Sequence, residues 1–249
     1  PDGKIYFAPH DADRALVIDP RQSTVETFGP ELSGEDKYRA GGVLAPDGKI
    51  YFAPYDADHA LVIDPCQSTV ETCGPAMRGE SKYEAAGVLA RDGKIYCAPR
   101  DADRAIVIDP GQSTVEKFGP ELPGYAKYVA DCVPTPDGKM YFAPYNADHA
   151  LVIDPCQSIV EVLGPKLPGD IGKYQAAGVL VPDGKIYFAP YSADSALVVD
   201  PRQSTVETCG PELPGANKYA AAGVLATNGK IYYAPVGQEG EHGVLVIDP

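Results

Sequence analysis

The sequence predicts an all-β fold from three observations: a tandem repeat of about 45 residues, four short apolar segments in each repeat, and turn residues between those segments. The pattern PDGKIYFAP or a close variant begins at residues 1, 46, 91, 136, 182 and 227. A second pattern, (L/I)V(I/V)DP, ends at residues 20, 65, 110, 155, 201 and 249. Six copies therefore begin and five are complete, which is typical of a repeat architecture.

The four apolar segments of one repeat have the length of strands and are too short for helices. One set covers residues 82–90, 94–99, 105–110 and 114–119. The first two segments are joined by Asp92-Gly93, where glycine accepts the positive φ of a tight hairpin. The last two are joined by Asp-Pro-x-Gln-Ser, where proline fixes φ and lacks a donor that a central strand would need. Each repeat is therefore expected to form a four-stranded antiparallel sheet.

The second and third segments are apolar at consecutive positions, as in Ile106, Val107 and Ile108, so both faces of the sheet must be covered. Four-stranded sheets that repeat at this period and pack against one another are typical of β-propeller blades. We predict a β-propeller of six blades of four antiparallel strands, with a fragment of a seven-bladed propeller as the alternative. The first and last blades are expected to be incomplete, because the chain opens in a second strand and closes in a third. A β-solenoid is the rival fold, but its rungs are usually shorter.

The repeat runs from residue 1 to residue 249 without a linker, so a single domain is predicted. The net charge of −14 disfavours nucleic acid and anionic lipid as partners. No apolar run approaches the roughly 18 residues of a membrane helix, so no membrane insertion is expected. The six cysteines do not fill matched positions in adjacent repeats, and we expect reduced thiols. The compartment stays open, with a reducing one favoured.

The order of the motifs GVLA, PDGKIYFAP and ALVIDP resembles the repeats of the YVTN and NHL β-propeller families. Those repeats run G-V-A, then P-D-G, then a Y-V-A strand, then V-x-V-I-D, and the resemblance covers the whole chain. It departs from the YVTN pattern after the final Asp, where Pro-x-Gln-Ser replaces Asn-Thr turns. The resemblance implies the propeller fold and hardly constrains activity, because propellers host enzymes, lectin-like binders and scaffolds.

A Lys-Tyr pair opens each inner strand and is the first candidate ligand site. On a propeller these pairs would ring the mouth of a central channel, where lysines attract anions and tyrosines stack on flat or sugar-like ligands. The alternative is structural, with each lysine paired to a loop aspartate and each tyrosine packed between blades. The ten residues are Lys37, Tyr38, Lys82, Tyr83, Lys127, Tyr128, Lys173, Tyr174, Lys218 and Tyr219.

A D-A-D motif in the loop between the second and third strands is the second candidate. Oxygen ligands at this spacing could hold a hard cation. Because the motif recurs in almost every repeat, satisfaction of the loop's own amides is the stronger interpretation, and no metal or cofactor is predicted. The weak metal candidates are Asp13, Asp58, Asp103, Asp148 and Asp194.

Catalytic motifs are missing from the sequence. There is no phosphate-binding glycine loop, no H-E-x-x-H and no nucleophile elbow, and His10, His59, His149 and His242 stand in loops of different repeats. Unlike residues are not seen at equivalent inner positions, apart from Asp131 beside Cys132. The last repeat carries a loop of different sequence at residues 236–243, either specialised for an interaction or drifted. Whether the chain is an enzyme is left open, with a leaning towards no.

Three functional hypotheses follow. The leading one is a non-enzymatic interaction or scaffold propeller that presents an acidic, loop-rich face to a protein partner or a larger assembly. The alternative is a multivalent propeller that binds small ligands or glycans between blades or at the Lys-Tyr pairs. The third, implied by resemblance to gluconolactonase-like propellers, is a metal-dependent lactonase-like hydrolase.

Overall fold

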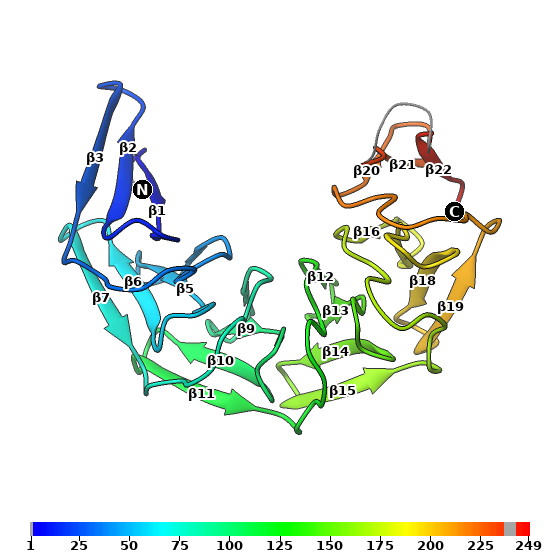
Figure 1. The fold of residues 1–249 in the computed structure, drawn as a ribbon, viewed down its shortest axis with the longest axis horizontal. Coiled ribbons are helices and arrows are strands. Elements are labelled where there is room, and N and C mark those ends of the chain that lie inside the picture. Colours follow the sequence, from blue (N-terminus) through cyan, green and yellow to red (C-terminus); the bar gives the residue numbers. More distant parts are fainter. Residues whose placement is uncertain (1, 237–242) are drawn as a thin grey trace. The chain divides into compact units, whose positions relative to one another are not determined.

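Twenty-two β-strands and no helix occur in the computed structural model, which describes residues 2–236 and 243–249. They form six antiparallel sheets, which we call blades 1 to 6 (Figure 1). The strands of the first three blades are, in order, β1 (Ile5–Phe7), β2 (Ala15–Asp19) and β3 (Thr24–Phe28); β4 (Val43–Leu44), β5 (Ile50–Phe52), β6 (Ala60–Asp64) and β7 (Thr69–Cys73); β8 (Val88–Leu89), β9 (Ile95–Cys97), β10 (Ala105–Asp109) and β11 (Thr114–Phe118).

The other three blades follow the same order. Their strands are β12 (Val133–Pro134), β13 (Met140–Phe142), β14 (Ala150–Asp154) and β15 (Ile159–Leu163); β16 (Val179–Leu180), β17 (Ile186–Phe188), β18 (Ala196–Asp200) and β19 (Thr205–Cys209); β20 (Val224–Leu225), β21 (Ile231–Tyr233) and β22 (Leu245–Ile247). Blades 2 to 5 have four strands, and blades 1 and 6 have three. The predicted sheet topology, including the incomplete first and last blades, is confirmed.

The first strand of each complete blade is shorter than the sequence predicted. The expected strand at 82–90 contains only Val88–Leu89. The stretch before it lies outside the ladder and links two blades, since the Lys82 amide donates to the Tyr55 carbonyl of blade 2 at 3.0 Å and the Lys82 carbonyl accepts the Arg100 amide of blade 3 at 2.8 Å. An apolar run of strand length is therefore mostly a linking segment between blades.

Both predicted hairpins are present, and aspartate side chains close them. In the first hairpin of blade 2, Gly48 has a φ of 83° and the Lys49 amide donates to Asp47 Oδ1 at 3.0 Å. In the second hairpin, Asp64 Oδ1 accepts the amides of Cys66 and Gln67 at 2.9 and 3.0 Å. Asp and Asn side chains commonly satisfy the backbone of their own turn in this way. Most of the repeated aspartates thus have a structural role.

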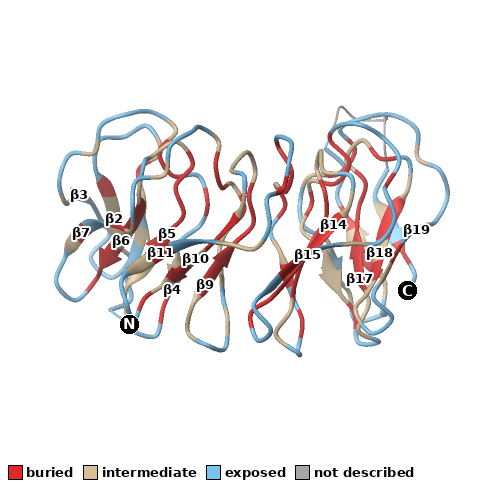
Figure 2. Cartoon of the chain, turned by 90° about the horizontal axis from the view of Figure 1, so that it is seen from below, coloured by how far each residue is buried: buried red, intermediate tan, exposed pale blue. Residues whose placement is uncertain are grey.

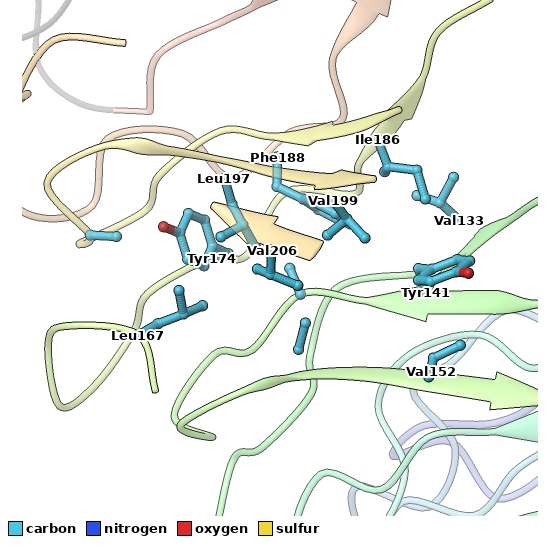
Figure 3. Packing of buried hydrophobic residues seen from close by; sticks show 13 residues of the cluster. Val133, Tyr141, Val152, Leu167, Tyr174, Ile186, Phe188, Leu197, Val199 and Val206 are labelled. Atoms are coloured by element: carbon cyan, nitrogen blue, oxygen red, sulfur yellow. The ribbon is translucent and has the colours of Figure 1, made fainter. Parts of the chain in front are cut away.

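Contacts divide the chain into two compact units, residues 1–123 with blades 1 to 3 and residues 124–249 with blades 4 to 6. The prediction of a single domain stays a prediction. Within each unit neighbouring blades pack face to face. In unit 2, Tyr141 and Val152 of blade 4 lie in one core cluster with Ile186, Phe188 and Val206 of blade 5 (Figure 3). Buried residues concentrate on the strands, and the hairpins are largely exposed (Figure 2).

The glycines that follow three of the outer strands, Gly29, Gly74 and Gly164, let the next blade approach closely. A Cβ atom on Gly74 would lie 2.5 Å from Cβ of Val115 in blade 3, and one on Gly164 would lie 2.4 Å from Cβ of Val206 in blade 5. Real Cβ atoms do not come this close, so the valine of one blade fits above a glycine of the blade before it. This contact recurs within both units and holds the blades in their order.

Candidate functional site

The lysines of the Lys-Tyr pairs are buried, each at most 2% exposed. Their Nζ atoms donate to the carbonyl of a glycine in the preceding turn, as Lys127 does to Gly124 at 2.8 Å and Lys173 to Gly169 at 3.0 Å; Lys37, Lys82 and Lys218 bind Gly34, Gly79 and Gly215 in the same way. Burial lowers the pKa of Lys82, Lys173 and Lys218, since it disfavours the charged form. Asp56 and Asp58 act in the opposite direction on Lys82.

The tyrosines are also buried, each at most 5% exposed. Their hydroxyls donate to the carbonyl just before the third strand of the blade that the pair leads into, with Tyr83 on Arg104 at 3.0 Å and Tyr174 on Ser195 at 3.1 Å. Tyr38, Tyr128 and Tyr219 make the same bond to His59, His149 and Gly243. Burial raises the pKa of Tyr38 to about 12, and it also raises the pKa of the other four tyrosines. The ligand-binding role of the ten residues stays a prediction.

The first position of the D-A-D motif joins two loops of its repeat. Asp11 Oδ1 accepts the Asp36 amide at 2.8 Å, and Asn146 Oδ1 accepts the Gly172 amide at 2.8 Å. Asp56 makes the same bond to the Ser81 amide, and Ser192 Oγ lies 3.5 Å from the Asn217 amide. The bond recurs with Asp, Asn and Ser, so it needs an acceptor oxygen and no negative charge. We call it the loop clasp.

The second aspartate of the motif is exposed in every repeat that has one, and these are the five weak metal candidates Asp13, Asp58, Asp103, Asp148 and Asp194. Their backbone carbonyls accept an amide from the next loop, for example Leu122 on Asp103 at 2.7 Å, while their carboxylates point outward. Lys117 Nζ lies 2.8 Å from Asp103, and Lys166 Nζ lies 3.0 Å from Asp148. These lysines lower the pKa of both carboxyls by hydrogen bonding to the charged form.

A polar cluster in unit 1 brings together unlike residues that the sequence reasoning missed. Arg39 Nη1 donates to the Tyr55 hydroxyl at 2.9 Å and lies 3.6 Å from Glu84 Oε1, and Arg100 Nε lies 2.7 Å from Glu84 Oε2. Both guanidinium groups lie over the Tyr55 ring, at 4.9 and 5.6 Å from its centre. Glu84 is paired with both arginines, and Arg100 also pairs with Asp101 at 3.1 Å, so the cluster joins blades 2 and 3 without leaving a general base or nucleophile poised for reaction.

The signal for this cluster lies in the variation among repeats. Residues 10, 55, 100, 145 and 191 occupy one repeat position and read His, Tyr, Arg, Tyr and Tyr, whereas residues 39, 84, 129, 175 and 220 read Arg, Glu, Val, Gln and Ala. At both positions the residue changes in size and charge from copy to copy, whereas the neighbouring strand motifs such as GKIYFAP and ALVIDP are largely repeated. The two positions are far apart in sequence and meet only when blades pack. Their contact therefore could not be predicted from the order of residues in one repeat.

One further group of side chains is arranged as metal ligands could be. His10 Nδ1 lies 3.0 Å from Asp11 Oδ2, and His10 Nε2 lies 2.8 Å from Asp36 Oδ1. Among residues 2–236 and 243–249, this is the group of three or more His, Cys, Asp or Glu side chains whose ligand atoms lie within 4.8 Å of one another. It includes none of the five aspartates proposed from the D-A-D motif. The Asp36 amide and the His10 ring, in that order of size, lower the pKa of Asp11.

A cavity of about 560 Å³ lies between blades 2 and 3 of unit 1. Lys82 and Tyr83 line it, together with Ala76, Met77 and Val115 and with charged residues at its edge. This volume falls within the range of small-molecule sites. Two of the predicted ligand-binding residues, Lys82 and Tyr83, therefore line a cavity of suitable size.

The remaining features singled out from the sequence contribute less to a candidate site. The unusual loop of the last repeat falls at residues 237–242, outside the described residues, and so does His242. Asp131 is exposed and Cys132 is half-buried. All six cysteines are free thiols, with Cys66 and Cys156 exposed. No helix in the part of the chain that the structure describes is long and apolar enough to cross a membrane.

Comparison with known proteins identifies the fold and no family. No family model and no curated protein matches the chain. Among solved structures, a virginiamycin B lyase from Staphylococcus aureus matches 93% of this chain and 73% of its own with a TM-score of 0.66 and 13% identity. A streptogramin B lyase matches 100% of this chain and 80% of its own, with a TM-score of 0.64 and 16% identity. An auxiliary nutrient binding protein from Bacteroides ovatus matches 93% of this chain and 63% of its own, with a TM-score of 0.53 and 13% identity.

At such identities these likenesses concern the fold alone. Together with the six antiparallel sheets they show that the chain is an all-β protein of the β-propeller class, with six blades of which the first and last are incomplete. The more specific resemblance to YVTN and NHL repeats stays a prediction. The similar structures include lyases and a nutrient binding protein, so the fold does not choose between catalysis and binding.

Proposed function

We propose that this propeller is a non-enzymatic interaction protein that binds a protein partner through the carboxylates of its loop face. The observation that carries the proposal is the exposure of the second D-A-D aspartate at the same repeat position in five blades, while the first position is engaged in the loop clasp. An exposed charge that the fold does not use, repeated in register, forms an acidic array on each unit.

The array favours a basic partner. Asp13, Asp58 and Asp194 have no ion pair within the described residues, and the pairs of Asp103 and Asp148 are with exposed lysines. Exposed pairs of this kind contribute at most about 1 kcal/mol, so a partner's lysines and arginines can replace them at little cost. Charge complementarity of this type speeds association and selects partners.

The proposal is tested by affinity capture from an extract of the source organism with three forms of the chain. The first is the wild type. In the second the five loop aspartates are changed to asparagine. In the third, the matched control, five exposed glutamates of the outer strands are changed to glutamine: Glu26, Glu71, Glu116, Glu161 and Glu207.

A specific partner should be retained by the wild type and by the glutamine form and lost by the asparagine form. Equal retention by all three forms, or loss from both substituted forms alike, would contradict recognition by the loop face and indicate general charge attraction.

A second candidate function, binding of a small ligand, is favoured by the cavity between blades 2 and 3. Ala76 lines this cavity where the other repeats have Glu31, Glu121, Lys166 and Glu212, so a short side chain keeps the space open. A calorimetric screen of sugars and metabolites should find a ligand that the wild type binds and Ala76→Glu does not. The control Lys166→Glu places the same residue at the equivalent position of the repeat, outside this cavity, and should leave binding intact. A screen without hits removes this candidate.

A further inference from the structure

The loop clasp of blade 1 differs from those of the other blades at two positions at once. Where blades 2, 4 and 5 have Tyr55, Tyr145 and Tyr191, blade 1 has His10. Where the others have Ser81, Gly172 and Asn217 as the amide donor, blade 1 has Asp36. The clasp itself uses only the side-chain oxygen of the first D-A-D residue and a backbone amide, so it explains Asp11 and requires neither the imidazole nor the second carboxylate.

These two departures place an imidazole between two carboxylates. His10 Nδ1 is 3.0 Å from Asp11 Oδ2 and His10 Nε2 is 2.8 Å from Asp36 Oδ1. The side chains are between 40% and 65% exposed, so an ion and its water can enter. Ligands of one ion at the usual bond lengths of about 2 Å lie no more than about 4 Å apart, so these atoms, which lie within 4.8 Å of one another, can share one ion after side-chain rotation.

The backbone holds the three residues in place before any ion arrives. The Asp36 amide donates to Asp11 Oδ1 at 2.8 Å, and the Lys37 amide donates to the His10 carbonyl at 3.0 Å. These bonds connect the loop after β1 to the segment that leads into blade 2. Because the loops are fixed by the fold, metal binding would require side-chain rotations that bring both carboxylates to one ring nitrogen, with the backbone kept as it is.

We propose that His10, Asp11 and Asp36 bind a divalent first-row transition metal ion of the zinc type. One imidazole nitrogen and two carboxylate oxygens, with water completing the shell, suit such an ion better than Ca²⁺, which takes oxygen ligands alone. The site is independent of the acidic loop array, since it shares none of its five aspartates. Its ligands come from both sides of the junction between blades 1 and 2, so a bound ion would hold these blades together.

The test is calorimetric titration of the chain with Zn²⁺ after treatment with a chelator, using variants that restore the repeat's own residues. His10→Tyr copies Tyr55, and Asp36→Ser copies Ser81, so both substitutions place residues that this fold already accepts. The control His59→Ser copies Ser195 and removes a histidine from a different loop. All variants keep the six cysteines, so any binding to thiols is common to them.

We expect one Zn²⁺ per wild-type chain in the tightest class of site, and at least about tenfold weaker binding in His10→Tyr and in Asp36→Ser. His59→Ser should bind as the wild type does. Zn²⁺ should also raise the unfolding temperature of the wild type and of His59→Ser but not of His10→Tyr, because an ion that binds only the folded state stabilises it. Equal affinity in wild type and His10→Tyr, or no binding at all, would overturn the proposal and leave His10 as an ion-paired side chain.

Discussion

At the scale of the residue, the lysine and tyrosine that precede each inner strand show what a repeated motif leaves open. Their position in every repeat was predictable, but the sequence allowed both a ligand role and a packing role. The structure adds their surroundings: Tyr174 is 1% exposed and its hydroxyl is bound to the Ser195 carbonyl. A Lys-Tyr pair that lined a channel would have the same sequence.

The Tyr174 hydroxyl gives a direct stability prediction. Tyr174→Phe removes one buried hydrogen bond and leaves the Ser195 carbonyl without that donor, so the free energy of unfolding should fall by about 1 kcal/mol. Urea denaturation measures the change. Tyr125→Phe is the control, since Tyr125 is 63% exposed and its hydroxyl should contribute almost nothing. Equal effects of the two substitutions would contradict the structural role of the repeated tyrosine.

At the scale of the element, the strands and hairpins could largely be predicted from the sequence, whereas the contacts between blades could not. Asp47-Gly48 and the Asp64-Pro65 turn follow from local backbone chemistry, which acts between neighbours in sequence. The predicted length of the first strand was wrong because the segment that begins at Lys82 links two blades, with the Lys82 amide bound to the Tyr55 carbonyl of blade 2. The polar cluster of Arg39, Tyr55 and Glu84 was missed for the same reason: its members meet through packing, which no single repeat encodes.

The contact between a valine and a glycine of neighbouring blades can be tested in unit 2. Gly164→Ala places a Cβ 2.4 Å from Val206 on a residue whose φ is +78°, so strain and overpacking should together lower the stability by about 2 to 4 kcal/mol. Gly41→Ala is the control, because nothing lies within 4 Å of its Cβ position and its φ is not positive. Chemical denaturation that ranks the two variants equally would contradict this account of blade packing.

At the scale of the whole molecule, the repeated tyrosines couple folding to high pH. Folding raises the pKa of Tyr38 to about 12 and that of Tyr83, Tyr128 and Tyr174 as well, from an ordinary value near 10. A raised pKa in the folded state means that the stabilising effect is complete below pH 10 and is lost as the pH rises towards the folded pKa. In this range each such tyrosine lowers the free energy of unfolding by up to about 1.4 kcal/mol per pH unit.

Absorbance at alkaline pH follows this coupling. The buried tyrosines of the Lys-Tyr pairs should ionise only above the ordinary value near pH 10, together with loss of the folded structure seen by circular dichroism. Ionisation of all tyrosines near pH 10 with the fold intact would contradict the burial of the Lys-Tyr pairs.

The net charge of −14 was visible from composition, but its distribution required the structure. Asp47 and Asp64 close hairpins and Asp11 closes a loop clasp, whereas Asp13 and Asp58 remain exposed. Identical side chains in one repeat therefore separate into those that fold the chain and those available to a partner. The proposed function depends on this separation.

The most direct measurement is the affinity of the captured partner for wild type and for the two fivefold-substituted forms, by calorimetry at about 50 and about 200 mM salt. Substitution of the loop aspartates by asparagine should weaken binding at the lower salt by at least about tenfold and flatten its salt dependence, while the glutamine form should stay within about threefold of wild type. Equal weakening in both forms, or none in the asparagine form, would contradict recognition through the loop face.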